Sequence, residues 1–361
     1  MLLLEQLCPI FCDALSDHAT ALLASPSPPQ RKRRRLNPDG KEPTITRSEV
    51  WYHDGNVVLQ AGLTEFRVHK SVLSSQSGHF RDMFAAKFSN IDLGVKGVQR
   101  IILPESADDW LNILLVLYNG FKTHDDLSLS VVRSMLRLEK KYRLEDFRSL
   151  AVKALMAEFP RDLGSWEARY IDALTRLPTI LPDLHPFEVV NLLYEAGVQS
   201  ILPVALYSCI EIYQLEEILL GSQRLWDQTL VQMLQAAQAR LAIGKERLLI
   251  AFMSWLQEHS AYISCHESII PLPQRKCNDR RSSLIETISS HWRNGRFFVP
   301  LRFVASDIPR DKCVDQIIVE IDAFRRRMWD DLPKYFDLPP WKDKSDLAGS
   351  SKVPSPQANC L

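Results

Sequence analysis

The chain has few cysteines, no N-glycosylation sequence and no long apolar run. Seven cysteines in 361 residues are an odd number without the density of a disulfide scaffold, and no Asn-x-Ser/Thr occurs. Both features favour a reducing compartment. No segment approaches the roughly 18 apolar residues of a membrane span. The apolar start at Met1 is interrupted by Glu5 and lacks the positive residues of a secretory signal. We expect a soluble protein of the nucleus or cytoplasm with no membrane partner.

The chain also has no excess charge of either sign. Lys and Arg number 44, Asp and Glu number 44, and the formal net charge is zero. Bulk electrostatics therefore attracts neither nucleic acid nor an acidic membrane, and any such role would need a local patch. Direct nucleic-acid binding is not expected.

Motifs for catalysis are missing as well. The sequence has no Gly-rich phosphate loop ending in Lys-Ser/Thr, no Gly-x-Ser-x-Gly elbow, and no His pair like that of a metalloprotease helix. Cys265-His266, Cys277 and Cys313 lack the close ligand pairs of a zinc site, which favours buried or idle thiols. We predict a protein that is not an enzyme, with no cofactor, metal or small-molecule substrate.

The most informative stretch runs from Asp54 to Phe84. It contains an expected strand at 57–60, a turn near Gly62, and a second strand ending at Val68, where apolar and polar residues alternate. After Val68 the apolar spacing changes to that of two short helices, broken near Ser77.

This stretch resembles the BTB/POZ domain. The signature Phe-Arg-Val-His-Lys-Ser-Val-Leu at 66–73 is followed by Ser-x-x-Phe-x-x-Met-Phe at 77–84, by Ile-Ile-Leu-Pro-Glu at 101–105, and by a helix ending in Tyr-Asn-Gly at 118–120. The sequences of residues 54–60 and 336–341 further resemble those of a group of BTB proteins of mushroom-forming (basidiomycete) fungi. The residues expected to serve structure or interaction are Asp54, Asn56, Phe66, His69, Lys70, Leu73, Ser77, Phe80, Met83, Phe84 and Tyr118.

The resemblance implies an α+β fold, in which a small sheet covered by helices is followed by an all-helical C-terminal region. It also implies protein–protein association, commonly as a homodimer. It makes His69 a structural residue at a strand-to-helix junction. Dimers of the family often use an extra helix before the first strand, but Thr44–Tyr52 is too short and polar for a long helix.

Two departures from the family pattern bear on partners. Asn56 stands where an Asp often pairs with the basic residue, here Lys70, so the charged pocket used by repressor-type members is halved unless Asp54 substitutes. Lys87 lies where cullin adaptors carry a glutamate. The favoured function is a BTB scaffold that binds itself and other proteins. The alternatives are a substrate adaptor of a cullin-type ubiquitin ligase and a nuclear transcription regulator, the latter without a visible DNA-binding motif.

A basic run precedes the domain inside a proline-rich segment that is expected to be disordered. It consists of Arg31, Lys32, Arg33, Arg34 and Arg35. Contiguous cations in an extended segment are typical of a nuclear localisation signal. A solvated linker and a phosphate-binding arm are the alternatives. Its deletion, followed by imaging of a tagged protein, decides between these interpretations.

We expect four parts: a largely disordered segment at 1–46, the BTB/POZ domain at 47–143, a helical region at 144–341 and a disordered tail at 342–361. Within the helical region, apolar periodicity and Gly or Pro stops predict helices at 144–159, 166–177, 186–196, 203–213, 225–242, 246–264, 284–292 and 312–329. Gly221 and Gly244 are expected breaks, and 271–281 is expected to be a polar loop. Arg325-Arg326-Arg327 is interpreted as a solvated helix face.

Overall fold

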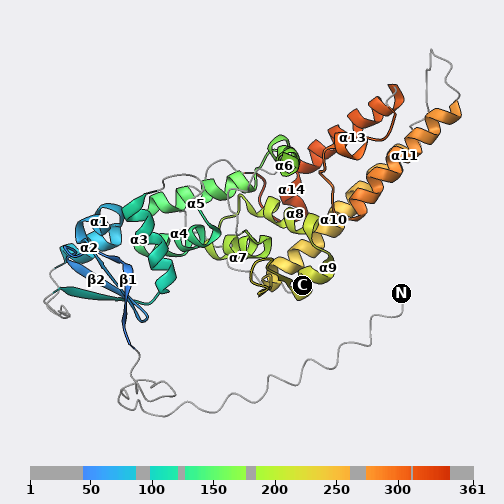
Figure 1. Ribbon diagram of the computed structural model, residues 1–361. Coiled ribbons are helices and arrows are strands. Elements are labelled where there is room, and N and C mark those ends of the chain that lie inside the picture. The colour runs from blue at the N-terminus through green and yellow to red at the C-terminus, as the bar shows by residue number, and fades with distance from the viewer. Residues whose placement is uncertain are drawn as a thin grey trace, which may run out of the picture. The chain divides into compact units, whose positions relative to one another are not determined.

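The computed structural model describes residues 44–86, 98–120, 127–175, 184–260, 274–309 and 312–341. Its elements belong to one compact unit that begins at Ile45. The expectations on the basic run, on Lys87 and on the tail from 342 lie outside the described residues. The fold is α+β, with a small sheet and helices followed by C-terminal helices, as predicted (Figure 1).

A four-stranded sheet forms the first layer, in the order β1-β3-β2-β4. Its strands are β1 (Thr46–Trp51), β2 (Val57–Ala61), β3 (Thr64–Val68) and β4 (Gln99–Leu103). β2 and β3 form an antiparallel hairpin around Gly62, whose positive φ of 57° suits a residue without a Cβ. β1 runs parallel to β3 and β4 parallel to β2. The sequence predicted β2, β3 and β4, and missed β1.

Five helices complete this part of the chain. They are α1 (Lys70–Gln76), α2 (Gly78–Ala85), α3 (Ala107–Asn119), α4 (Leu129–Tyr142) and α5 (Glu145–Glu158). Serine side chains accept the free N–H groups at three N-termini, at Ser77, Ser106 and Ser128. The helices and the sheet share a core of fully buried residues such as Phe66, Phe80 and Trp110.

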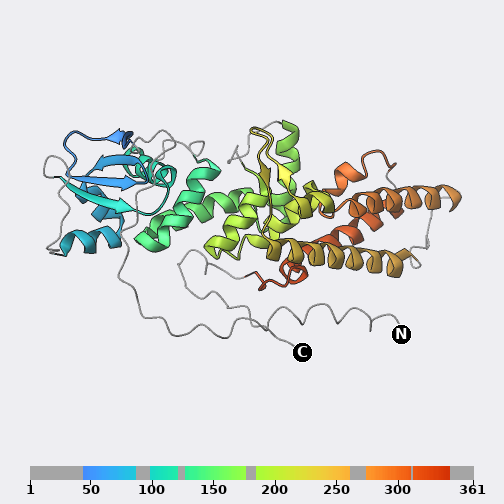
Figure 2. The same cartoon turned by 90° about the horizontal axis from the view of Figure 1, so that it is seen from below.

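The helical region follows without a further large sheet. Its helices are α6 (Leu163–Thr175), α7 (Pro186–Ala196), α8 (Leu202–Ile212), α9 (Leu215–Leu220), α10 (Gln235–Ser260), α11 (Gln274–Arg293), α12 (Leu301–Val304), α13 (Lys312–Asp330) and α14 (Leu332–Tyr335). α10, α11 and α13 lie side by side (Figure 2). Within the described residues, no helix is long and apolar enough to cross a membrane.

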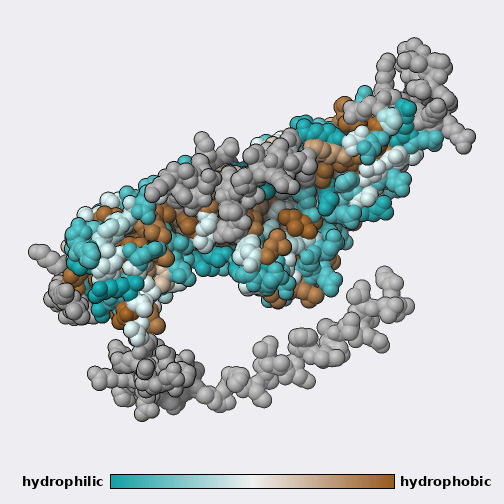
Figure 3. All heavy atoms as spheres, in the orientation of Figure 1, coloured by the Kyte–Doolittle hydropathy of each residue, from teal (hydrophilic) through white to brown (hydrophobic). Residues whose placement is uncertain are grey.

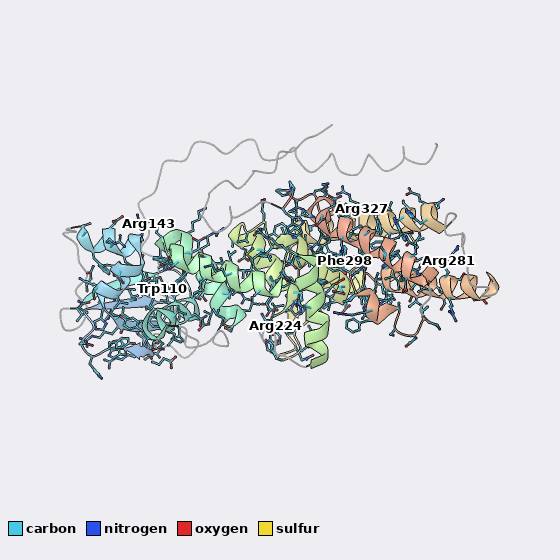
Figure 4. All side chains as sticks on the ribbon, turned by 90° about the horizontal axis from the view of Figure 1, so that it is seen from above. Trp110, Arg143, Arg224, Arg281, Phe298 and Arg327 are labelled. Carbon is cyan, nitrogen blue, oxygen red and sulfur yellow. The ribbon has the colours of Figure 1, made fainter. Side chains whose placement is uncertain are left out.

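An aromatic cluster holds the centre of the helical region. Phe298 packs edge-on against Tyr207 and Trp329, with ring centroids 4.9 Å apart in both pairs, and Trp329 also contacts Trp166. The backbone N–H of Phe298 donates to the Tyr207 hydroxyl at 3.1 Å. Figure 4 shows Phe298 between the helices. The apolar segment at 297–301 is therefore a core connection, in line with its composition.

Three expectations about the helical region were wrong. A helix was predicted from Leu225, but β5 (Ser222–Gln223) and β6 (Leu230–Val231) form a hairpin there, and α10 begins only at Gln235. Gly221 opens the hairpin with φ of 103°, and a Cβ on it would lie 2.8 Å from the carbonyl oxygen of Val231. The apolar residues of the hairpin loop have the spacing of one turn of an amphipathic helix, which explains why a helix was predicted there.

Gly244 was predicted to be a break, yet α10 runs through it. A Cβ at this position would lie 2.2 Å from the ring of Phe336, which is fully buried. This glycine therefore permits a close contact between α10 and the end of α14. The segment at 271–281 was predicted to be a loop, and from Gln274 it is helical.

Candidate interaction surfaces

The strand-to-helix junction gathers several residues of the family signature. His69 is the N-cap of α1, and its backbone N–H donates to the hydroxyl of Tyr118 at 2.8 Å. The Nδ1 atom of His69 lies 3.0 Å from the same hydroxyl, and Nε2 lies 3.3 Å from the carboxylate of Asp54. Tyr118 in turn stacks on Tyr52, with centroids 4.4 Å apart. His69 thus ties β3 to α3, which is a structural arrangement.

Charge at this junction is modest. The Asp54 side chain is 84% exposed, and hydrogen bonds from its own backbone and from His69 lower its pKa. Partial burial raises the pKa of Tyr118. Among the described residues, neither a cysteine thiol nor a serine hydroxyl is hydrogen-bonded to His69. The histidine therefore has no serine or cysteine nucleophile beside it in this part of the chain.

Asn56 and Lys70 meet, but not as a charged pair. The side-chain oxygen of Asn56 accepts the backbone N–H of Lys70 at 2.8 Å, which satisfies a free donor in the first turn of α1. The Lys70 ammonium lies 5.3 Å from the ring centroid of Phe84. Asn56 can therefore hold the helix start as an aspartate would, but its neutral amide supplies no charge to pair with Lys70. Asp54 contacts His69 and does not replace the missing partner.

A second cluster lies on the other side of the two short helices. The Ser77 hydroxyl donates to the carbonyl oxygen of Tyr142 at 2.5 Å and accepts from the backbone N–H of Phe80 at 3.2 Å. The rings of Phe80 and Tyr142 stack with centroids 5.4 Å apart. The Tyr142 hydroxyl donates to Glu105 at 2.6 Å, and burial together with this hydrogen bond raises the pKa of Tyr142. Sequence reasoning missed Tyr142 and Glu105, because nothing local marks partners so distant in the chain.

The remaining signature residues fill the core. Phe66 and Leu73 are buried, and Met83 and Phe84 are half-buried against the same core. Their roles are in packing, which positions the surfaces of the sheet and helices.

Three exposed apolar side chains lie at one end of the sheet. Thr46 pairs with Thr64, Ala61 pairs with Thr64, and Ala61 pairs with Leu103. This register places Ile45, Leu63 and Ile102 at the same end, where they are 42%, 49% and 72% exposed. We call these three residues the apolar sheet end. Nearby charge is internally balanced, since Arg100 pairs with Glu65 at 2.9 Å.

The helical region offers a cleft beside its aromatic cluster. The cleft has a volume of about 480 Å³ and is lined by residues of α6, α12 and α13 with mixed character: Glu167, Pro300, Leu301, Arg302, Ile318, Val319, Asp322, Ala323, Arg325 and Arg326. Arg325 was interpreted as part of a solvated face, but it is only 1% exposed and bridges Glu167, Asp322 and the carbonyl oxygen of Phe298. Its neighbour Arg326 is exposed. Helical spacing alone does not distinguish these two arginines, because their different burial depends on the tertiary fold.

No metal site is assembled in the part of the chain that the structure describes, where no three His, Cys, Asp or Glu residues cluster as ligands. Cys265 lies outside the described residues, as do the side chains of Cys277 and Cys313. The interpretation of these thiols stays a prediction.

One carboxyl group in the helical region makes folding stability depend on pH. Burial near the end of α8 raises the pKa of Glu211 from 4.5 to about 7, against the attraction of Arg169 and Arg296. Because the folded state holds this proton more tightly than the unfolded state, the stability contributed by Glu211 falls as pH rises from 4.5 through 7.

We therefore expect Glu211→Gln to stabilise the protein at pH 8, by at most about 3 kcal/mol, and to have little effect at pH 4. Thermal unfolding of both proteins at the two pH values measures this. Glu216→Gln, on the exposed part of α9, serves as the control for loss of a glutamate that is not buried. A Glu211→Gln effect that is the same at pH 4 and pH 8 contradicts the assignment.

The fold and the signature residues described above lie in a sheet-and-helix module, and the family match identifies it as a protein-interaction module. Residues 52–158 match the family model described as the BTB/POZ domain, so this part of the chain is a BTB/POZ domain. The match ends with the last residue of α5. A comparison with curated proteins found no match for the chain. The resemblance to a fungal group stays a prediction, as does the boundary at residue 143.

Proposed function

We propose that this protein is a non-enzymatic scaffold that forms a homodimer through its BTB/POZ domain and binds further proteins. The apolar sheet end carries the proposal. Three strands or turns that are distant in sequence contribute Ile45, Leu63 and Ile102 to it, and each side chain is more than one-third exposed. Grouped exposed apolar side chains on a soluble domain mark association surfaces.

Self-association fits this surface better than binding to a charged partner. A twofold contact places the same patch on both copies, so uncompensated like charges would oppose it. Here Arg100 and Glu65 neutralise each other. The edge strand β4 also presents Ile102, with 72% of its surface exposed, and unpaired edges favour pairing with another chain.

The test is light scattering of the full chain at about 10 µM. The wild type should have twice the mass of the chain, and Ile102→Lys with Leu63→Ser should halve that mass. Val319→Ser on α13, which removes a side chain that is 62% exposed elsewhere, should leave the dimer intact. A monomeric wild type, or a double variant that remains dimeric, overturns the proposal.

The alternatives to a simple scaffold are a substrate adaptor of a cullin-type ubiquitin ligase and a nuclear transcription regulator. Each needs its own experiment. Retention of a cullin in a pull-down with the purified chain would favour the adaptor. Its absence, together with loss of nuclear entry on deletion of residues 31–35, would favour a nuclear scaffold.

A further inference from the structure

Exposed apolar side chains are concentrated in one short segment outside the BTB/POZ match. Sixteen large hydrophobic side chains are exposed in the described part of the chain, and eight of them fall within residues 212–234. They are Ile212, Leu215, Leu219, Leu220, Leu225, Trp226, Leu230 and Leu234. Figure 3 shows hydrophobic side chains on the lower face in the region between α7 and α9. Isolated exposed leucines need no explanation, but such a concentration does.

The most exposed member, Leu225, lies beside Trp226 at the tip of the β5–β6 hairpin. Leu225 is 90% exposed and Trp226 is 52% exposed. We call this pair the hairpin tip. Tryptophan is enriched among the residues that dominate binding energy at protein interfaces, because it combines a large apolar area with little conformational freedom.

The hairpin is held firmly, so the tip is presented in one orientation. Arg224, which begins the hairpin loop and is labelled in Figure 4, donates through both Nε and Nη2 to the carboxylate of Glu188 on α7. Its Nη1 atom also donates to Asp227 at 3.0 Å. Glu188 accepts a further bond from Arg133 on α4 at 2.8 Å. This network joins the hairpin to a helix of the BTB/POZ domain.

The side-chain amide of Asn191 holds the chain where it leaves the second strand of the hairpin. Asn191 on α7 donates to the carbonyl oxygen of Gln232 and accepts the backbone N–H of Leu234, both at 2.9 Å. Asp227 accepts the backbone N–H of Thr229 at 3.0 Å, which closes the turn and lowers the pKa of Asp227. A preorganised tip loses less entropy on binding than a flexible loop.

The charge around the tip decides what kind of surface it fits. Segment 215–234 carries Glu216, Glu217 and Asp227 and a single cation, Arg224, which pairs with Glu188 and with Asp227. Arg224 thus offsets Asp227, and Glu216 and Glu217 on α9 supply the remaining negative charge of the segment. The apolar surface is therefore bordered by negative charge. An identical copy would bring like charges together, and an anionic membrane would be repelled.

We propose that the hairpin tip docks into an apolar pocket with a lysine- or arginine-bearing rim on a different protein. Leu225 and Trp226 enter the pocket, and Glu216 and Glu217 face the basic rim. This contact is separate from the apolar sheet end, so a dimer could present two tips to partners.

The probe is a phage-displayed library of random 12-residue peptides, selected on the full-length wild type. Selected peptides should combine aromatic or aliphatic residues with Lys or Arg. In fluorescence anisotropy they should bind Trp226→Ser and Leu225→Ser at least tenfold more weakly. Ile250→Ser, at a side chain 56% exposed on α10, is the matched control and should bind as the wild type does. Glu216→Lys with Glu217→Lys should shift the selection to acidic peptides.

Other outcomes contradict the proposal. They are a selection that yields no peptide, peptides that bind Trp226→Ser as well as the wild type, and peptides without basic residues. Light scattering that shows loss of self-association in Trp226→Ser would assign the tip to a second copy. Sedimentation with phosphatidylserine vesicles that depends on Trp226 would assign it to a membrane. Unchanged thermal unfolding of the variants verifies that they fold.

Discussion

Gly244→Ala should destabilise the protein by roughly 2–3 kcal/mol, even though alanine is the better helix former. In an ordinary helix interior this substitution gains about 1 kcal/mol. Here the new Cβ would lie 2.2 and 2.3 Å from two ring carbons of Phe336. That ring is fully buried, so it cannot move aside without disturbing α10 and α14. The overpacking outweighs the gain in helix propensity.

Urea unfolding followed by circular dichroism measures the change, and a double-mutant cycle identifies its cause. Phe336→Ala alone should cost about 3–5 kcal/mol, because it opens a cavity. In that background, Gly244→Ala should become neutral or stabilising, since the clashing ring is absent. Gly164→Ala is the control, because a Cβ there meets only an Asp162 oxygen at 3.5 Å. Stabilisation by Gly244→Ala in the wild-type background would refute the close contact.

The sequence predicted those elements whose apolar spacing is regular and whose ends carry strong signals. The α7 range, Pro186–Ala196, was predicted to the residue, because Pro186 can occupy a first helical turn and Gly197 adopts the left-handed conformation after the last. The junction at Ser77 was likewise readable, because one serine ends α1 and caps α2.

The errors arose where tertiary contacts decide the local structure. Gly244 is a packing glycine, and only the position of Phe336 distinguishes it from a helix stop. The hairpin at 222–231 depends on α7, which binds it through Glu188 and Asn191. Neither partner is near in sequence. Local periodicity therefore could not separate this hairpin from a helical turn.

In the candidate site, too, some features could be predicted from the local sequence and others depend on tertiary contacts. The family signature located His69 and Tyr118 separately, but the hydrogen bonds between them span 49 positions. The apolar sheet end requires the strand register, because Ile45, Leu63 and Ile102 form no continuous motif. Surfaces made from several segments become visible only once the strand order is known.

Arg325→Met should be the other strongly destabilising substitution, at a cost of about 3 kcal/mol. The Arg325 guanidinium is 1% exposed and donates to Glu167 at 2.6 Å and to the Phe298 carbonyl oxygen at 2.8 Å. Its removal leaves the carbonyl oxygen of Phe298 and the partly buried carboxylate of Glu167 without this donor. Loss of one member of a buried ion pair costs more than the pair contributes, because the other charge remains.

Arg326→Met supplies a matched control on the same turn of the same helix. Arg326 also binds Asp322, at 2.9 Å, but its side chain is 67% exposed. An exposed pair contributes about 0–1 kcal/mol, so this variant should unfold almost like the wild type. Adding Glu167→Gln to Arg325→Met should recover part of the loss by removing the unpaired charge. Equal losses for the two arginine variants in urea unfolding would show that burial does not distinguish them.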